Sequence, residues 1–308
     1  MHDQSRRQFL SMLTAASAGA LLPVAQSFAV EQEPWFRISL AQWSLHRAFQ
    51  NRTANPQDFP RLARRLFDID GVEYVNQFYS DNYSAALTRK LQQQADGEGV
   101  QSLLIMVDGE GDIGAETDAA RKQTVARHQR WAEMAKELDC HSIRVNAHSH
   151  GSYDEQMKKA ADGLHLLGEY CEGLGLNVLV ENHGGLSSNG EWLSGVMRLA
   201  DHPRVGTLPD FGNFHIDREN GLTYDRYRGV RELMPWAKAI SAKSYDFDEN
   251  GEAVQTDFQR MLDIVRTAGY RGWVGIEYEG NRLSEIEGIE KTLALLQRMQ
   301  RGGQNRFL

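Results

Sequence analysis

Cysteine is scarce in this 308-residue chain, which carries only Cys140 and Cys171. The two thiols have no CxxC or Cys/His spacing, which argues against a disulfide scaffold and against a cysteine-ligated metal centre. We expect both to be core thiols rather than a disulfide pair or a nucleophile. Linkers rich in proline, glycine or serine are missing as well, which favours a single domain.

Positive charge is in deficit, because 34 Lys and Arg residues stand against 42 Asp and Glu residues, for a formal net charge of −8. No basic block offsets this balance, so we expect no nucleic-acid partner. No apolar run reaches the about 20 residues that a bilayer span needs, so we expect no stable membrane anchor. With 41% hydrophobic and 25% charged residues, the composition is that of a globular protein with a full core.

The first residues form a separate segment. It contains Ser5-Arg6-Arg7-Gln8-Phe9-Leu10, continues as a weakly apolar, alanine-rich stretch, and closes on Ser27-Phe28-Ala29. A basic start, a short apolar region and a small-residue cleavage site are typical of a secretory signal, and the paired arginines resemble a twin-arginine export signal. We therefore expect residues 1–29 to be a twin-arginine signal peptide read by the export machinery, residues 30–308 to be the folded domain, and the periplasm to be the destination.

Eight apolar, β-branched runs bounded by turn residues recur along the rest of the chain. These candidate strands are Phe36–Trp43, Gly71–Phe78, Val100–Val107, Ser142–Ala147, Asn177–Val180 continuing into Glu181, Val205–Asp210, Ala239–Lys243 and Trp273–Tyr278. Helical patterns lie between them, for example at Ala119–Leu138, Tyr153–Leu174 and Asp257–Ala268. Strands alternating with helices form a parallel sheet, and eight such units close most naturally into a (β/α)8 TIM barrel.

An open doubly wound sheet is the alternative fold. That fold would favour a glycine-rich phosphate loop after the first strand. The first strand here ends Gln42-Trp43-Ser44-Leu45-His46, which contains no glycine. We therefore predict a single α/β domain of the TIM-barrel class.

Carboxylates stand at the ends of three strands, as Glu181, Asp210 and Glu277. In a TIM barrel the active site lies at the carboxyl ends of the strands, so these groups should converge over the barrel mouth. Crowded carboxylates repel one another unless a cation or a proton lies between them. We predict that the three hold a divalent metal; such ligands suit Mn²⁺, Mg²⁺ or Co²⁺, and Zn²⁺ less well. The alternative is that each is a salt-bridged loop residue or a helix cap.

Three motifs at these strand ends resemble a known family. Glu181-Asn182-His183-Gly184-Gly185, Pro209-Asp210-Phe211-Gly212-Asn213 and Gly275-Ile276-Glu277-Tyr278-Glu279 are similar to the strand 5, 6 and 8 motifs of the xylose isomerase-like barrels. Within that group, the resemblance is closest to the sugar phosphate isomerase/epimerase proteins, and it runs from Ile38 to about Met299. It implies a divalent metal held by Glu, Asp, His and Glu from strands 5 to 8.

The seventh strand departs from this pattern. The family motif there reads His-x-Lys, whereas this chain has Ser241-Ala242-Lys243, so Ser241 stands at the position of the histidine ligand. Three outcomes are open: water or His183 completes the coordination, the metal affinity is lowered, or the metal is absent. Lys243 shares a strand face with Ser241, where its ammonium would anchor substrate oxygens or replace part of the cation's role.

The resemblance implies proton transfer next to a carbonyl group. A metal would act as Lewis acid on the substrate carbonyl, and a carboxylate would remove and return the proton. We expect Glu181 and Glu277 to be the acid/base pair, with Glu279 as the alternative to Glu277 because the two share strand parity. The predicted function is therefore a sugar isomerase or epimerase.

Aromatic and amide side chains near the strand ends suit a small-molecule sugar substrate, because apolar sugar faces stack on rings while amides bind hydroxyls. The residues that we expect to bind substrate are Trp43, Asn146, His148, His183, Asn213 and Lys243. Barrel packing is the alternative role for the aromatics, and a satisfied loop histidine is the alternative for His148.

The expected export changes the expected substrate, because phosphorylated sugars are normally confined to the cytoplasm. A free sugar, a glycoside or an oxidised sugar is expected instead. Two other functions stay open. A lyase would use the same proton abstraction to expel the aglycone of a 3-keto-glycoside by β-elimination. A non-catalytic carbohydrate-binding barrel is the other, because Ser241 stands where the metal-binding histidine is expected.

Overall fold

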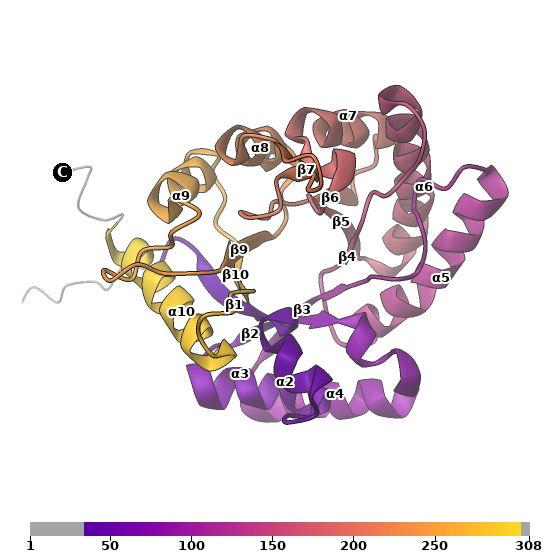
Figure 1. Cartoon of the computed structure of the whole chain (residues 1–308). Coiled ribbons are helices and arrows are strands. Elements are labelled where there is room, and N and C mark those ends of the chain that lie inside the picture. Colours follow the sequence, from indigo (N-terminus) through magenta and orange to yellow (C-terminus); the bar gives the residue numbers. More distant parts are fainter. Residues whose placement is uncertain (1–33, 303–308) are drawn as a thin grey trace, which may run out of the picture. The chain divides into compact units, whose positions relative to one another are not determined.

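A computed structural model describes residues 34–302, and this part of the chain folds into a (β/α)8 barrel (Figure 1). The barrel strands are β1 (Arg37–Ala41), β2 (Gly71–Val75), β3 (Gln101–Met106), β4 (Ser142–Val145), β5 (Asn177–Glu181), β6 (Val205–Leu208), β9 (Ile240–Ser244) and β10 (Trp273–Tyr278). The predicted fold class is confirmed. The expected signal peptide, residues 1–29, lies outside the described residues.

Seven of the eight strand junctions are parallel ladders, in the order β6-β5-β4-β3-β2-β1-β10-β9, and the β2–β3 ladder shifts register between Val72 and Glu73. The eighth junction, between β6 and β9, closes the barrel through separate bridges rather than a continuous ladder. Ser241 N donates to Pro209 O, and Phe211 N donates to Ser241 O, each over 3.0 Å. This seam consequently pairs Asp210 with Ser241.

Helices surround the strands (Figure 1). They are α2 (His46–Gln50), α3 (Phe59–Phe67), α4 (Ala85–Glu98), α5 (Asp118–Glu137), α6 (Tyr153–Leu174), α7 (Gly190–Ala200), α8 (Arg226–Leu233), α9 (Phe258–Thr267) and α10 (Glu285–Gly302). Helix α6 begins with a capping box between Ser152 and Glu155 and ends at Gly175 in the left-handed conformation, so local sequence defines both of its ends. None of the helices in the described part combines the length and apolar character that a membrane span requires.

Four predicted strands run two or three residues too far, because β1, β2, β4 and β6 end at Ala41, Val75, Val145 and Leu208. The chain leaves β1 and β2 earlier than the apolar pattern indicates, in the 3₁₀ helices η1 (Gln42–Leu45) and η3 (Asn76–Phe78). The Gln42 side chain accepts a hydrogen bond from Val75 N over 2.9 Å and donates to the Tyr79 hydroxyl over 2.6 Å. A side chain thus takes the place of a strand partner at the mouth of the barrel. A short hairpin, β7 (His215–Asp217) with β8 (Leu222–Thr223), was not predicted.

The barrel wall separates an outer apolar layer from an interior that holds both polar groups and a smaller apolar cluster, which includes Leu104, Met106, Leu179 and Leu208. Strand β9 illustrates the division, because Ile240 and Ala242 belong to the large hydrophobic core whereas Ser241 and Lys243 face the carboxylates of the barrel interior. At the narrow interior, a Cβ on Gly275 would lie 2.5 Å from Glu73 Oε1, so glycine is needed there. Cys140 and Cys171 are buried free thiols, as predicted.

Candidate functional site

The three predicted carboxylates meet at the carboxyl ends of their strands. Glu181 ends β5, Asp210 follows β6 by two residues, and Glu277 lies near the end of β10. One oxygen atom of each lies within 4.8 Å of the others. Their side chains are almost fully buried, with exposures of 1%, 0% and 3%. The sequence prediction that these residues form one cluster agrees with this geometry.

The Pro-Asp-Phe-Gly-Asn segment positions Asp210 through its own backbone. Asp210 Oδ1 accepts hydrogen bonds from Gly212 N over 2.8 Å and from Asn213 N over 2.7 Å. The Asn182 side chain accepts from Asp210 N over 2.8 Å and donates to Asp210 O over 3.0 Å. Asp210 Oδ2 remains free to face the cluster, and its direction is set by local sequence.

Ser241 joins two of the carboxylates. Its hydroxyl lies 2.6 Å from Asp210 Oδ2 and 2.7 Å from Glu277 Oε2. A hydroxyl has one hydrogen to donate, so the second short contact requires a proton on one of the carboxyl groups. Burial raises the pKa of Asp210 to about 7 against the opposing charge of Lys243. For Glu277, burial acts to raise the pKa, but Lys243 and Ser241 outweigh it and hold that pKa below its usual range. In the metal-free site these opposite shifts favour Asp210 over Glu277 as the carrier of that proton.

Lys243 brings a positive charge into the cluster. Its Nζ lies 3.4 Å from Glu279 Oε2, 3.6 Å from Glu277 Oε1 and 3.9 Å from Asp210 Oδ2. Burial alone would lower the pKa of Lys243, but these carboxylates raise it well above its usual range. The lysine is therefore an ammonium ion at neutral pH, as expected for a group paired on several sides.

Arg144 is a member of the site that the sequence interpretation missed. This β4 residue is 4% exposed, and its Nε lies 2.9 Å from Glu181 Oε2 while its guanidinium also contacts Asp108 Oδ1 at 2.7 Å. Asn146 donates to the same Asp108 oxygen over 2.6 Å. The available clue was strand parity, because residues 144 and 146 share one face of the strand and the latter was already assigned to the site.

Glu181 is held between two partners. Arg144 lies on one side, and Asn213 Nδ2 donates to Glu181 Oε1 over 3.0 Å on the other. Burial, helped by the charge of Glu277 and opposed by Arg144, raises the pKa of Glu181 to about 7. Asn213, which we expected to contact substrate, is 5% exposed, and its amide orients Glu181.

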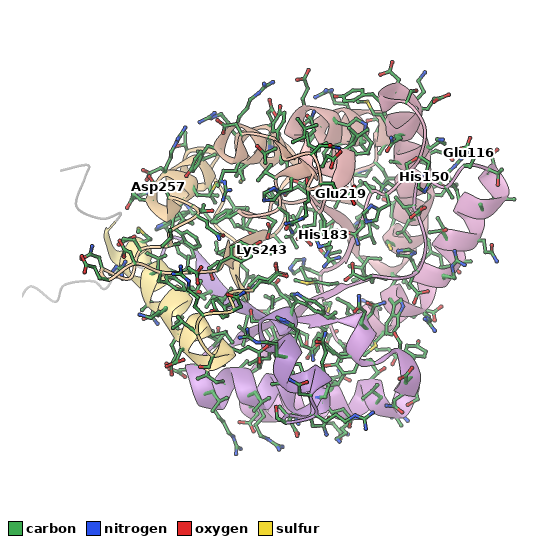
Figure 2. All side chains as sticks on the ribbon, viewed as in Figure 1. Glu116, His150, His183, Glu219, Lys243 and Asp257 are labelled. Carbon is green, nitrogen blue, oxygen red and sulfur yellow. The ribbon has the colours of Figure 1, made fainter. Side chains whose placement is uncertain are left out.

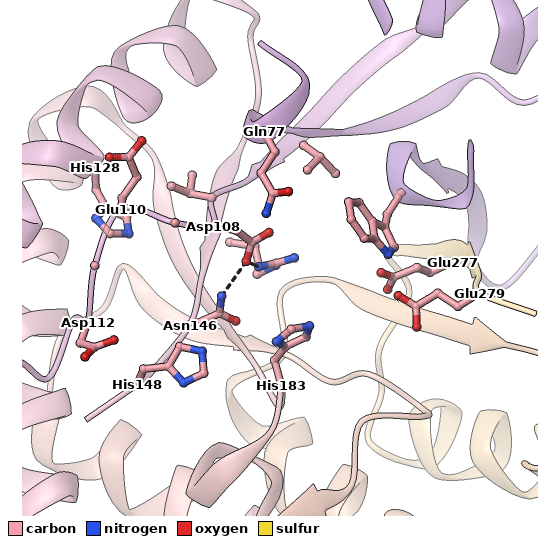
Figure 3. Close-up of a pocket in the computed structure, with 16 residues that line it drawn as sticks. Gln77, Asp108, Glu110, Asp112, His128, Asn146, His148, His183, Glu277 and Glu279 are labelled. Carbon is pink, nitrogen blue, oxygen red and sulfur yellow. Dashed lines mark hydrogen bonds and ion pairs between the residues drawn. The ribbon is translucent and has the colours of Figure 1, made fainter. Parts of the chain in front are cut away.

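A cavity of about 500 Å³ reaches the cluster at Glu277, whereas Glu181 and Asp210 are not among its lining residues (Figure 3). Five of the residues expected in the site line it, namely Trp43, Asn146, His148, His183 and Glu277. Glu279, the alternative carboxylate, lines it as well, together with residues that were not predicted, such as Gln77 and Asp108. Figure 2 shows Lys243 and His183 inside the ring of helices, whereas Glu116 and Asp257 lie toward its rim.

The residues present fit a divalent cation. Glu181, Asp210 and Glu277 offer three oxygen ligands at short mutual distance, and within residues 34–302 they are the one such group. Glu181 Oε2 accepts no hydrogen bond of good geometry, although Arg144 Nε is near, so this buried oxygen has ligand capacity left. His183 is not part of the group, so it does not replace the histidine ligand that was expected at the position of Ser241. An all-oxygen set suits Mg²⁺ or Mn²⁺ best.

Fold and site together define a (β/α)8 barrel with a buried carboxylate cluster at its catalytic face. The profile of the Xylose isomerase-like TIM barrel family matches residues 60–299, and the chain belongs to this family.

Solved structures of low sequence identity share the fold. A D-tagatose 3-epimerase-like protein has 17% identity and a TM-score of 0.66, over 88% of this chain and 100% of that one. The 3-keto-D-glucoside 4-epimerase of E. coli has 15% identity and a TM-score of 0.65, over 86% of this chain and 99% of that one.

A shorter sequence match relates one segment of the chain to a curated protein. Over 73 residues it is 32% identical to the alpha subunit of the C-glycoside deglycosidase of Arthrobacter globiformis. The match covers 22% of this chain and 21% of that subunit, so the chain aligns with about a fifth of this curated relative.

Proposed function

We propose that the protein is a sugar isomerase or epimerase that transfers a proton at the carbon next to a carbonyl group. The observation that carries the proposal is geometric: Glu181 and Glu277 are two buried carboxylates of one cluster, placed at the carboxyl ends of β5 and β10. Two carboxyl groups in one site are the usual means of removing a proton from carbon and returning it. Family membership and the epimerases among the structural neighbours support the same chemistry.

Each residue of the cluster has a distinct role in this proposal. Glu277 takes the proton from the substrate carbon, and Glu181 returns one at the same or the neighbouring carbon. Lys243 and Arg144 balance the negative charge of the cluster through their ion pairs with Glu277 and Glu181. When bound by Glu181, Asp210 and Glu277, a divalent cation supplies Lewis-acid polarisation of the substrate carbonyl.

Solvent exchange tests the proton transfer directly. Keto sugars incubated with the protein and Mn²⁺ in deuterium oxide are expected to gain deuterium at the carbon next to the carbonyl. The Glu181→Gln variant is expected to lose about 10²- to 10⁴-fold of the rate, because the amide cannot carry the proton. Circular dichroism verifies that the variant is folded. Exchange that survives undiminished in folded Glu181→Gln would contradict the assignment.

A lyase is the second candidate, because the matched relative is named a C-glycoside deglycosidase. The same base would abstract the proton next to the carbonyl of a 3-keto-glycoside, and the electron pair left behind would expel the aglycone from the neighbouring carbon. Product analysis separates the two candidates. Free aglycone and an unsaturated keto sugar identify the lyase, whereas an isomeric product of unchanged mass identifies the isomerase or epimerase.

Export to the periplasm by the twin-arginine route remains part of the proposal, on the strength of Arg6 and Arg7 and the Ser27-Phe28-Ala29 pattern. Expression of the full chain in a bacterium tests it. We expect mature protein in the periplasmic fraction with an N-terminus at residue 30, and an Arg6→Lys/Arg7→Lys variant retained as the longer precursor. Full-length wild-type protein confined to the cytoplasm would overturn the assignment.

A further inference from the structure

The cavity extends well beyond the carboxylates. Glu277 and Glu279 stand at one end of it, and Asp112, His128 and His148 stand at the opposite end (Figure 3). We call this second end the outer lobe. A cavity of about 500 Å³ lies in the range of about 300–1,000 Å³ that encloses drug-sized ligands, which are larger than one hexose. A single sugar ring at the carboxylates would leave the outer lobe empty.

His128 gives the outer lobe its chemical character. This α5 residue is 3% exposed, and its Nδ1 lies 2.8 Å from the carbonyl oxygen of Thr124. A carbonyl oxygen only accepts hydrogen bonds, so Nδ1 carries the hydrogen. Burial lowers the pKa of His128, which keeps the ring neutral. Its Nε2 is therefore a hydrogen-bond acceptor, and it has no partner among residues 34–302.

The other polar groups of the outer lobe do not satisfy this nitrogen. The Glu110 carboxylate accepts from Trp131 Nε1 over 2.7 Å and pairs with Arg130. Asp112 pairs with the exposed His150 over 3.1 Å. His128 lines the cavity, and its Nε2 is not among the fully buried atoms, so this acceptor is open to a donor on whatever fills the cavity.

We propose that the outer lobe is a subsite for a hydroxyl-bearing group linked to the sugar, so that the substrate is a glycoside rather than a free monosaccharide. The hydroxyl donates to His128 Nε2, and His148, whose side chain also lines the lobe, provides a second contact. This inference rests on the proposed function for what occupies the carboxylate end, and it names the substrate class of that site.

Binding of unreactive glucosides tests the subsite without turnover. Titration calorimetry on the full chain compares 4-hydroxyphenyl, phenyl and methyl β-D-glucosides and a β-linked glucose disaccharide. We expect the 4-hydroxyphenyl compound to bind at least about fivefold more tightly than the phenyl compound, as one added hydrogen bond provides. The hydroxyl group can belong to a phenolic aglycone or to a second sugar, and the disaccharide distinguishes the two. It binds more tightly than the 4-hydroxyphenyl glucoside if the natural group is a second sugar.

Variants then assign the effect to His128. His128→Phe is expected to abolish the preference for the hydroxylated ligand, and His128→Gln, which retains an acceptor, is expected to restore part of it. His165→Phe is the matched control, because His165 is a half-exposed α6 histidine with Nδ1 against Ala200 O, and it does not line the cavity.

Equal affinities for the hydroxyphenyl and phenyl glucosides, or no binding of any of the four ligands, would overturn the subsite. Deuterium exchange separates this failure from that of the proposed function. Exchange into a free keto sugar without aglycone selectivity leaves the function standing and removes the subsite. Selective glucoside binding without any exchange supports the subsite and contradicts the proposed function.

Discussion

At the scale of single residues, the cluster is organised around a serine. Ser241 contributes a neutral hydroxyl between Asp210 and Glu277, so it links two carboxylates where an imidazole would take a ligand position. A neutral link neither cancels charge nor adds a strong metal ligand. Lys243 and Arg144 therefore provide the positive charge of the site within the protein itself.

Replacing Ser241 tests this reading of the cluster. Ser241→His is expected to lower the dissociation constant for Mn²⁺ by at least about tenfold, because imidazole adds a fourth protein ligand. Calorimetric titration of metal-stripped protein measures the change. Ser241→Ala, which removes the hydroxyl without adding a ligand, is the control. An unchanged constant in folded Ser241→His would place the residue outside the metal's reach.

Glu73 makes the metal-free barrel sensitive to pH. Burial raises the pKa of this carboxyl to about 7, although Ser39 donates to Oε1 over 2.6 Å, and Oε2 has no partner. The folded state then holds the proton more tightly than the unfolded state, whose glutamate has its ordinary pKa of 4.5. The contribution of Glu73 to the free energy of unfolding is consequently most favourable below pH 4.5, and it is lost as the pH rises through about 7.

Denaturant unfolding in the presence of a chelator measures this contribution. Wild type is expected to lose up to about 3 kcal/mol of unfolding free energy between the two pKa values through this group. Glu73→Gln is expected to avoid this loss, because the amide stays neutral. The exposed α10 residue Glu290 offers the control substitution, Glu290→Gln. The same pH slope in Glu73→Gln and wild type would show that Glu73 is not the source.

At the scale of elements, the β3–α5 loop and helix α6 set the shape of the cavity. The loop contributes Asp108 and Asp112 to the cavity lining, and Gly163 of α6 lies against it. A Cβ at Gly163 would stand 1.9 Å from the backbone oxygen of Ile113, so the contact requires glycine. The position of the outer lobe thus depends on a contact between two elements.

Gly163→Ala is expected to destabilise the protein by about 1–3 kcal/mol and to weaken glycoside binding, because the loop must move away from the helix. Gly173→Ala is the matched control on the same helix, since nothing lies within 4 Å of its Cβ position. That variant should be neutral or gain about 0.5–1 kcal/mol from helix propensity. Thermal unfolding and titration calorimetry measure both. Equal effects of the two substitutions would argue against the contact.

At the scale of the whole molecule, the seam that closes the barrel also brings two residues of the site together. The β6–β9 seam joins the sheet ends through separate bridges, and Asp210 and Ser241 pair across it. A cation bound by Glu181, Asp210 and Glu277 would hold three strands, including one side of the seam. Ligand binding to the folded state alone stabilises it by mass action.

We therefore expect Mn²⁺ at 100 times its dissociation constant to stabilise the metal-stripped protein by about 2.7 kcal/mol, and a chelator to reverse the gain. For a domain of this size, each kcal/mol raises the melting temperature by about 2–4 °C. Scanning calorimetry measures the shift. Asp210→Asn should reduce it, and an equal shift in that variant would place the cation elsewhere.

Much of this protein follows from local sequence. Alternating residues in each strand and apolar patterns between them determine eight βα units, and the strand ends determine that Glu181, Asp210 and Glu277 meet at one face. The ends of the first two strands were not predictable in this way, because the partner of Val75 is the side chain of Gln42, which lies in the 3₁₀ helix after β1.

Only the tertiary structure decides how those residues interact. The bridge from Ser241 to Asp210 and Glu277 depends on the register across the seam, and the pairing of Arg144 with Glu181 depends on the register of β4 with β5. Register is a long-range property, because shifting a strand by one residue turns every side chain to the other face. The sequence by itself thus determined that the three carboxylates reach the barrel mouth, and packing decided which charged and polar partners each of them meets.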